Sequence, residues 1–295
     1  NYTLSFKERL RYAPLLEMSL LTNLSEDFGM LMAENVQAFV EENSISQIDL
    51  IASHGHTVFH EPENGITLQI GNPKPIYDLL KIPVAYDFRT QDVLLGGQGA
   101  PLVPFVDQLL FSEYDACLNL GGFSNISFDV DRKRLAFDIC PVNIVLNLWA
   151  NKLGFDFDDK GMLASSGVIH LPLLEHSNKL DYYAKPLPKS LGWEWVQNSI
   201  IPLIEKENLS AVNVLRTYTE HAALQMVSVF EKYKLKTVFV SGGGVYNSFL
   251  LHRMNQLSKH ISFKIDNQLV ESKEAIAFAF LGLMKIHKQI NVLSS

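Results

Sequence analysis

The chain has 295 residues, of which 47% are hydrophobic and 19% charged, a composition typical of a globular protein with a sizeable core. The net charge of -7 and the lack of a basic cluster argue against a nucleic-acid-binding protein. No apolar stretch reaches the roughly 18 residues that a membrane span needs. Cys117 and Cys140 both lie in apolar segments, which favours a reduced cytoplasmic protein over a disulfide-stabilised one.

The first hundred residues predict one long helix followed by short strands. Apolar side chains at helical spacing indicate an amphipathic helix over residues 25–42, with Ser25 as its N-cap. Short apolar runs predict three strands, at 48–52, 67–70 and 83–86. A polar turn is expected at 53–57. Residues 96–101 contain too many glycines for a helix interior and predict a loop.

Beyond residue 115, strands and helices alternate. Apolar runs predict four strands, at 116–120, 124–128, 135–139 and 238–240. Helical spacing predicts three helices, at 143–153, 217–233 and 274–286. Thr217 and Glu220 match a capping box, and residues 156–167 are expected to form a loop. This order predicts an α/β fold, in which ligands bind at the carboxyl ends of strands.

Three segments at strand ends could carry chemistry. The turn NLGGFSN at 119–125 could cradle a phosphate through its backbone N–H groups, or it could be an ordinary hairpin turn. Asp138 could act as a general base or cap the following turn. The glycines at 242–244, with Asn247 opening a helix, are compatible with a nucleotide but match neither the dinucleotide fingerprint nor the P-loop.

Histidines form a cluster in the first half of the chain. His54, His56 and His60 could ligate zinc, or they could hydrogen-bond a polar ligand or their own loop. No third-shell carboxylate set accompanies them.

Charged residues around the glycine loop offer a further candidate. Arg89 lies between Asp87 and Asp92 and could recognise a carboxylate, or the three could be a surface ion-pair cluster. Glu274, at the expected start of the last helix, could complement the helix dipole.

In combination, these motifs resemble one family. They are SHGHTVFHEP, TLQIGNP, DFRTQDVLLGGQGAPLVP, NLGGFSNISF, FDICPVN, KGMLASSG, LPKSLGWE, VSGGGVYN and EAIAFAFLG. Over residues 48–284 the ordered set resembles 1,6-anhydro-N-acetylmuramic acid kinase. The resemblance implies a two-lobed, actin-like ATPase of ribonuclease H-like type. Residues 1–112 with 275–295 would form the sugar-side lobe, and residues 113–274 the nucleotide-side lobe.

The resemblance also implies a reaction. Water would open the 1,6-anhydro bridge of the amino sugar, and the freed O6 would take the γ-phosphoryl group of ATP, with Mg²⁺ as the accompanying ion. The product would be N-acetylmuramic acid 6-phosphate, an intermediate of peptidoglycan recycling. A cytoplasmic homodimer without nucleic-acid or membrane partners is expected.

The resemblance assigns roles to individual residues. Asp138 would be the base that activates the water. The expected nucleotide-binding residues are Asn119, Gly121, Gly122, Asn143, Gly161, Gly242, Gly243 and Asn247. The expected substrate-binding residues are Arg89, Glu274, His56 and Asp92, with the cationic Arg89 suited to the lactyl carboxylate. No metal ligand is assigned.

The sequence departs from the family pattern in three ways. No G-T-S-x-D-G motif occurs, so the first phosphate loop and the first strands of lobe one are expected to be missing. Cys140 and Val142 stand where the family has glycines, which would narrow backbone approach there, and His56 replaces a glutamine. A sugar-binding paralogue with impaired catalysis therefore stays open as an alternative, and a metallohydrolase using the histidines as a third hypothesis.

Overall fold

The computed structural model describes residues 2–290 and separates into two compact units. Unit 1 comprises Asn1–Val106 and Glu274–Ser295, and unit 2 comprises Asp107–Lys273. The chain passes from one unit to the other within α5 (Val103–Leu110) and within α14 (Asn267–Ile286). Over residues 2–290, no helix combines the length and apolar character required to cross a membrane.

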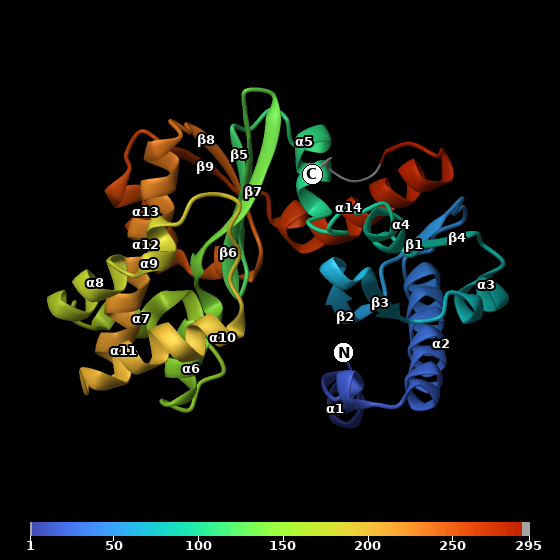
Figure 1. The fold of residues 1–295 in the computed structure, drawn as a ribbon, viewed down its shortest axis with the longest axis horizontal. Coiled ribbons are helices and arrows are strands. Elements are labelled where there is room, and N and C mark those ends of the chain that lie inside the picture. Colours follow the sequence, from blue (N-terminus) through green and yellow to red (C-terminus); the bar gives the residue numbers. More distant parts are fainter. Residues whose placement is uncertain (1, 291–295) are drawn as a thin grey trace. The chain divides into compact units, whose positions relative to one another are not determined.

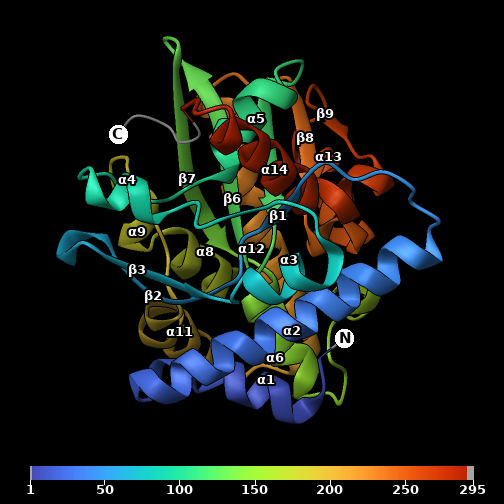
Figure 2. The same cartoon turned by 90° about the vertical axis from the view of Figure 1, so that its right-hand side faces the viewer.

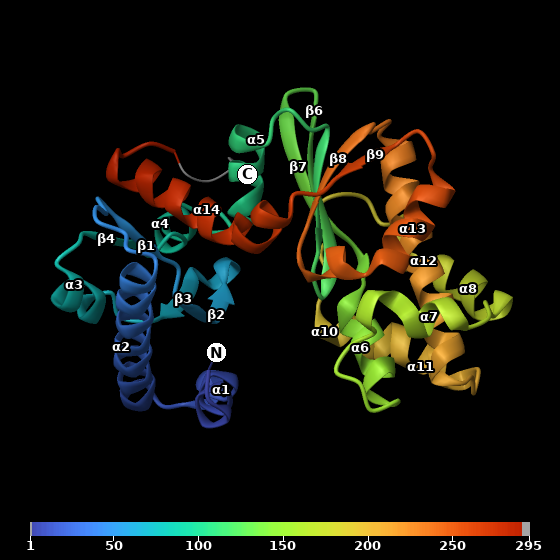
Figure 3. The same ribbon diagram turned by 180° about the vertical axis from the view of Figure 1, so that it is seen from behind.

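Unit 1 contains two small sheets and several helices. Its helices are α1 (Leu4–Arg11), α2 (Met18–Glu42), α3 (Lys74–Leu80) and α4 (Thr90–Leu94), with short 3-10 turns η1 (Ala13–Leu15) and η2 (Pro62–Asn64). The strands are β1 (Ile51–Ser53), β2 (His56–Glu61), β3 (Ile66–Ile70) and β4 (Val84–Tyr86). Strands β1 and β4 pair in parallel, whereas β2 and β3 form an antiparallel hairpin. Helix α2 lies beside α3 (Figure 3).

Two apolar clusters hold unit 1 together. In the first, Leu24 and Phe28 of α2 pack against Ile70 at the end of β3. In the second, Ala277 and Leu281 of α14 pack with neighbours that include Ala85 of β4. The C-terminal half of α14 therefore belongs to the core of unit 1, although it is distant in sequence from the rest of the unit.

Unit 2 is built on one five-stranded sheet. Its strands are β5 (Ala116–Leu120), β6 (Phe123–Val130), β7 (Lys133–Pro141), β8 (Thr237–Ser241) and β9 (Ser262–Lys264). The order is β7-β6-β5-β8-β9. Figure 2 labels β7, β6, β8 and β9 from left to right. Strands β5, β6 and β7 form an antiparallel meander, while β8 and β9 run parallel to β5 and β8 respectively. This is the ribonuclease H-like topology, and it confirms the predicted α/β class.

Helices cover one face of this sheet. Helix α12 (Ala211–Lys232) packs on β7, and α6 (Asn143–Asn151) and α13 (Ser248–Leu257) contribute to the same apolar core; all three are labelled in Figure 1. The remaining segments are η3 (Asp159–Gly161), α7 (Met162–Ser166), α8 (Leu171–Asn178), α9 (Asp181–Ala184), α10 (Trp193–Trp195), the π-helical η4 (Val196–Ile200), α11 (Ile201–Lys206) and the 3-10 turn η5 (Gly243–Tyr246).

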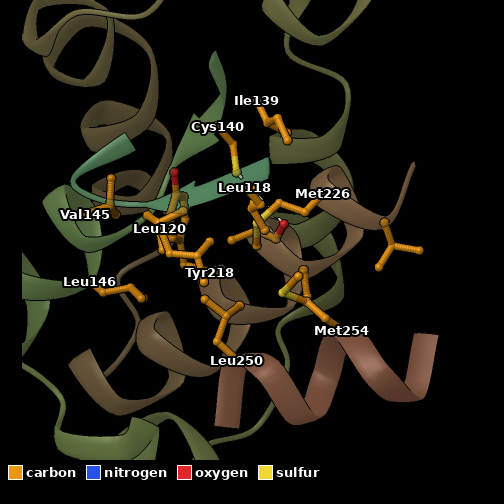
Figure 4. Packing of buried hydrophobic residues seen from close by; sticks show 14 of the residues in the cluster. Leu118, Leu120, Ile139, Cys140, Val145, Leu146, Tyr218, Met226, Leu250 and Met254 are labelled. Atoms are coloured by element: carbon orange, nitrogen blue, oxygen red, sulfur yellow. Dashed lines mark hydrogen bonds between the residues drawn. The ribbon is translucent and has the colours of Figure 1, made fainter. Parts of the chain in front are cut away.

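The core of unit 2 lies between that face and the helices. Leu118 and Leu120 of β5 are fully buried against Tyr218 and Met226 of α12 and Leu250 of α13 (Figure 4). Alternate residues of β5 point to the opposite face, because successive side chains along a strand alternate. On the opposite face, Cys117 of β5 and Phe239 of β8 are buried with Phe111 in a second apolar cluster, and Asn119 lies on that face beyond Cys117.

Several predicted boundaries were wrong, two of them because a side chain resembled a cap. Ser25 lies inside α2, and its hydroxyl accepts a hydrogen bond from the Gly71 N–H. Helix α12 begins at Ala211 with Ser210 as its N-cap. The supposed cap Thr217 is buried within the helix and donates instead to the Asn213 carbonyl.

Other differences concern the ends of elements. The strand expected at 48–52 is β1, which starts three residues later and ends one residue later than that range. Strand β2 begins at His56, inside the expected turn. The expected loop 156–167 contains η3 and α7, because the Asp158 carboxylate accepts from the N–H groups of Leu163 and Ala164 and so caps a helix. Helix α14 begins at Asn267, so Glu274 is interior and does not complement the helix dipole.

Candidate active site

The candidate base lies on the face of the unit 2 sheet opposite α12. Asp138 of β7 pairs with Asn125 of β6, Asn125 pairs with Asn119 of β5, and Asn119 pairs with Ser241 of β8. Paired residues project on the same face, and neighbouring strands are about 4.8 Å apart. A row of polar side chains therefore crosses the sheet, ending at Ser241, just before the glycine bend.

A β-bulge sets the orientation of Asp138. Ser124 pairs with Cys140 and Asn125 with Asp138, so Ile139 is an extra residue in β7. Ile139 and Cys140 are both buried in the apolar core, whereas Asp138 is only half-buried. Val142 is also buried in the core. The side chains of Cys140 and Val142, at positions where the resemblance led us to expect glycines, therefore pack into the core of unit 2.

The surroundings of Asp138 favour a proton acceptor. Burial raises the pKa of its carboxyl group, and a hydrogen bond from the Leu191 N–H to Oδ2 only partly opposes this. Among residues 2–290, no Lys or Arg forms an ion pair with this carboxylate, and Oδ1 accepts no hydrogen bond. A carboxylate with a raised pKa and one free oxygen is a suitable general base.

Two glycine segments meet beside the row of polar side chains. Gly242 has a φ of +85°, and a Cβ there would come within 2.4 Å of Oδ1 of Asn119. A Cβ on Gly244 would come within 2.7 Å of the Leu120 side chain. The Asn143 side-chain amide donates to the Leu120 carbonyl over 3.2 Å. The end of β5, the bend after β8 and the start of α6 thus form one contiguous surface.

The turn at Gly121 and Gly122 is tied to the same surface. The Gly122 carbonyl accepts hydrogen bonds from the N–H groups of Val142 and Ile144, and the Gly121 carbonyl accepts from Asn143. With their carbonyls turned toward the start of α6, these glycines connect β5 to the helix that follows Asp138.

A second contact continues the surface toward α13. Gly161 has a φ of +73°, and a Cβ on it would come within 2.3 Å of Oδ1 of Asn247. Asn247 caps α13, since its Oδ1 accepts from the Leu250 N–H, and its own N–H donates to the Gly244 carbonyl. The structure therefore brings together all eight residues that the sequence analysis expected to contact a nucleotide.

The expected substrate residues lie in unit 1, where Arg89 is the centre of a polar cluster. Its Nε donates to Nε2 of His54 over 2.9 Å, and its Nη1 donates to the Gly99 carbonyl over 2.8 Å. The Asp92 carboxylate accepts from the Gly99 N–H over 2.6 Å. Arg89 and Asp92 therefore fix the glycine loop from its two sides.

The partner of Arg89 is a neutral histidine. Burial, and then the charge of Arg89, lower the pKa of His54. Its Nδ1 contacts the Gly55 carbonyl and must carry the proton, which leaves Nε2 as the acceptor for Arg89. Among the described residues no carboxylate forms an ion pair with Arg89, so its positive charge is not neutralised by the protein.

The three histidines do not converge. His60 contacts the Thr67 hydroxyl, and the His56 ring lies edge-on to Phe28. Across residues 2–290, no three His, Cys, Asp or Glu side chains gather as they would around a metal ion. The arrangement gives no support to the metallohydrolase hypothesis.

Glu274 is exposed on α14, one helical turn before Phe278. The Phe278 ring packs against His54 with centroids 4.6 Å apart. Residues four apart share a helix face, so Glu274 lies on the same face of α14 as the contact with His54. Arg89, His54 and Asp92 are thus brought together around Gly99, whereas no hydrogen bond or ion pair among the described residues joins Glu274 to them, and His56 lies outside the cluster.

Unit 1 also contains a pocket that the sequence did not indicate. Its volume is about 420 Å³, within the range of ligand sites. It lies at the carboxyl ends of the parallel strands β1 and β4, beside the first half of α2. Its polar lining includes Ser25, Glu26, Ser53, His54, Gln69 and Thr90. The lining residues come from four segments that are separate in the sequence, so the sequence alone gives no sign of this pocket.

Comparison with known proteins identifies the family. A family model described as anhydro-N-acetylmuramic acid kinase matches residues 10–293. The anhydro-N-acetylmuramic acid kinase of Idiomarina loihiensis is 35% identical over 320 residues, which cover 98% of this chain and 85% of that protein. The enzyme of that name from Sulfurovum sp. is 34% identical over 88% of this chain and 75% of that protein.

Among solved structures, the (R)-2-hydroxyglutaryl-CoA dehydratase component A of Acidaminococcus fermentans has a TM-score of 0.42 at 12% identity, covering 76% of this chain and 78% of that chain. A ROK family glucokinase from Streptomyces griseus has a TM-score of 0.36 at 12% identity, covering 84% of this chain and 86% of that chain.

The extent of the family match places the chain among the phosphotransferases, in a class that acts on sugar hydroxyls. The chain belongs to the anhydro-N-acetylmuramic acid kinase family.

Proposed function

We propose that this chain uses ATP to convert 1,6-anhydro-N-acetylmuramic acid into N-acetylmuramic acid 6-phosphate, as a cytoplasmic enzyme of peptidoglycan recycling. The observation that carries the proposal is the placement of Asp138. Its carboxylate has one free oxygen and a raised pKa, and it lies on the sheet whose ends carry the two glycine segments. Membership of the family supports the choice of substrate.

In this reaction Asp138 acts as the base. Oδ2 is held by the Leu191 N–H, so Oδ1 takes the proton from a water molecule. The water oxygen bonds to the anomeric carbon as the bond from that carbon to O6 breaks. The electron pair left on O6 forms the new bond to the γ-phosphorus of ATP, and ADP leaves. One water, one anhydro sugar and one ATP give one sugar 6-phosphate, one ADP and one proton.

The nucleotide would lie along the surface formed by the glycine segments. Apart from its chain neighbours, no residue of the part that the structure describes has an atom within 4 Å of a Cβ placed on Gly243, so the backbone there is open to a ligand. The expected contacts are Asn119, Gly121, Gly122, Asn143, Gly161, Gly242, Gly243 and Asn247. Mg²⁺ would accompany ATP and neutralise phosphate charge. A magnesium ion held mainly by phosphates and water requires no dedicated protein cage, which fits these residues.

The sugar would be recognised in unit 1. Nη2 of Arg89 donates no hydrogen bond among the described residues, so the guanidinium can bind the lactyl carboxylate. The adjacent pocket, which His54 lines, is large enough for the amino sugar ring. Glu274, Asp92 and His56 stay as proposed contacts. We also propose a homodimer, which sedimentation analysis of the purified protein tests.

The proposal is tested by the identity of the product. The full chain is incubated with ATP, Mg²⁺ and 1,6-anhydro-N-acetylmuramic acid in H₂¹⁸O, and the product is analysed by mass spectrometry. We expect a sugar 6-phosphate with one ¹⁸O at the anomeric position and one ADP per sugar. Calorimetry that shows sugar binding without nucleotide binding or turnover would support the sugar-binding paralogue instead.

A further inference from the structure

A segment far from β7 in the sequence contacts Asp138 at three of its atoms. The Leu191 N–H donates to Oδ2 over 2.8 Å. The Tyr182 hydroxyl donates to the Asp138 carbonyl over 2.5 Å, and the Asp138 N–H donates to the Lys189 carbonyl over 3.3 Å. Strand β7 is at the edge of its sheet, so this segment pairs with an otherwise open strand edge.

The Lys189 side chain links the two ends of this segment by hydrogen bonds to the backbone near Tyr182. Its Nζ donates to the carbonyls of Tyr182 and Tyr183 over 3.2 and 3.4 Å, and it lies 4.6 Å from the centre of the Tyr182 ring. Among the described residues it has no carboxylate partner. An ammonium group used in this way holds Tyr182 and Leu191, nine residues apart, in fixed positions relative to Asp138.

We infer that Tyr182, Lys189 and Leu191 form a clamp that positions the Asp138 carboxylate for proton transfer. The clamp leaves Oδ1 as the reactive oxygen by holding Oδ2. None of its three members is assigned a role by the proposed reaction, and the inference rests on that reaction.

The hydrogen bond from the Leu191 N–H to the Asp138 carboxylate shows that this segment does more than cover the edge strand β7. Protection of the strand edge requires only the backbone bond between Asp138 and Lys189. The additional bond from Leu191 to the carboxylate fixes its rotamer, and the Tyr182 bond fixes the peptide that follows it. Misplacement of a reacting group by about 1 Å can cost roughly 100-fold in rate.

Steady-state kinetics of single variants test the clamp. For Lys189→Met and Tyr182→Phe we expect kcat to fall by about 10-fold or more, with the KM of sugar and of ATP within about 2-fold of wild type. Lys189→Arg keeps donors for the two carbonyls and should recover most of the loss. Lys185→Met is the matched control, because this lysine lies four residues before Lys189 in the sequence, is exposed, and its side chain makes no hydrogen bond within residues 2–290.

Amide hydrogen exchange provides a readout that does not depend on the reaction. In Asp138→Ala and in Lys189→Met, the Leu191 amide should exchange at least about 10-fold faster than in wild type. In Lys185→Met its exchange rate should stay unchanged. Faster exchange in Lys189→Met with kcat near the wild-type value would overturn the positioning role. Unchanged exchange in Lys189→Met would overturn the role of Lys189. If the wild-type chain turns over and only the clamp variants lose activity, the result supports the clamp. If the wild-type chain itself shows no turnover, the proposed function is refuted and the clamp with it.

Discussion

A Cβ atom on Gly242 would come within 2.4 Å of Oδ1 of Asn119, so the bend after β8 rests directly on the end of β5. Apart from its chain neighbours, no described residue has an atom within 4 Å of a Cβ placed on the next residue, Gly243. One glycine is thus required by the packing of the protein, and its neighbour faces open space.

This difference predicts that alanine at Gly242 lowers stability, whereas alanine at Gly243 weakens nucleotide binding. Gly242→Ala should destabilise the protein by about 2 kcal/mol or more, because the added methyl group clashes with Asn119 and the left-handed φ is strained. Gly243→Ala should leave the free energy of unfolding within about 0.5 kcal/mol of wild type but raise the KM for ATP. Denaturant unfolding and kinetics measure the two effects. An unchanged KM in Gly243→Ala would remove this residue from the nucleotide site.

Arg89 is expected to bind the lactyl carboxylate of the substrate. Arg89→Gln should raise the KM for 1,6-anhydro-N-acetylmuramic acid by about 10- to 100-fold, the value of a charge-assisted hydrogen bond. For a substrate analogue without the lactyl group, Arg89→Gln should raise KM much less. The control is Arg132→Gln, at an exposed turn in unit 2. Equal losses for the two sugars would show that Arg89 acts on the loop and not on the carboxylate.

Glu220 links α12 to α13, and its contribution to stability should depend on pH. Burial alone would raise the pKa of Glu220, but hydrogen bonds from Arg253 and Arg216 outweigh it and lower the pKa below its usual value. The bonds from Arg253 are 2.7 Å long, and the Glu220 side chain is 7% exposed. Because the folded-state pKa is lowered, the stabilisation is complete above pH 4.5 and is lost as pH falls through the folded pKa.

Glu220→Gln should therefore destabilise the protein by about 3 kcal/mol at pH 7, with the difference from wild type shrinking below pH 4.5. Urea unfolding at pH 7 and at lower pH measures this. Glu175→Gln is the control, because its ion pair with Lys179 is exposed and should be worth less than about 1 kcal/mol. A difference that grows on acidification would contradict the assigned sign.

Local patterns predicted the fold where a strand or helix is specified by its own side chains. The strand at 116–120 was placed correctly, because four of its five residues are buried and the run ends at two glycines. Cap predictions failed because Ser25 and Thr217 lie inside helices that begin further upstream, where the Ser25 hydroxyl accepts from the Gly71 N–H and the Thr217 hydroxyl donates to the Asn213 carbonyl. The helices α1, α3, α4 and α5 were missed, because helices of at most 8 residues are too short for their apolar spacing to stand out in the sequence.

The candidate site was only partly visible in the sequence. Asp138 and the glycines stand out by residue type at strand ends, but the donor that holds the Asp138 carboxylate lies 53 residues further along the chain. The LPKSLGWE motif signalled this segment without indicating its partner. The bulge at Ile139 was equally hidden, since it depends on pairing with β6. Such long-range contacts arise from the tertiary fold and leave no periodic signal.

The central claim is that the Asp138 carboxylate activates the water, and Asp138→Asn tests it most directly. The amide keeps the shape of the side chain and an oxygen for the Leu191 N–H, but it cannot take a proton. We predict a fall in kcat of about 10²- to 10⁴-fold for sugar phosphate formation, with sugar and ATP still bound in calorimetry. An Asp138→Asn variant that forms the sugar 6-phosphate at the wild-type rate would contradict the account.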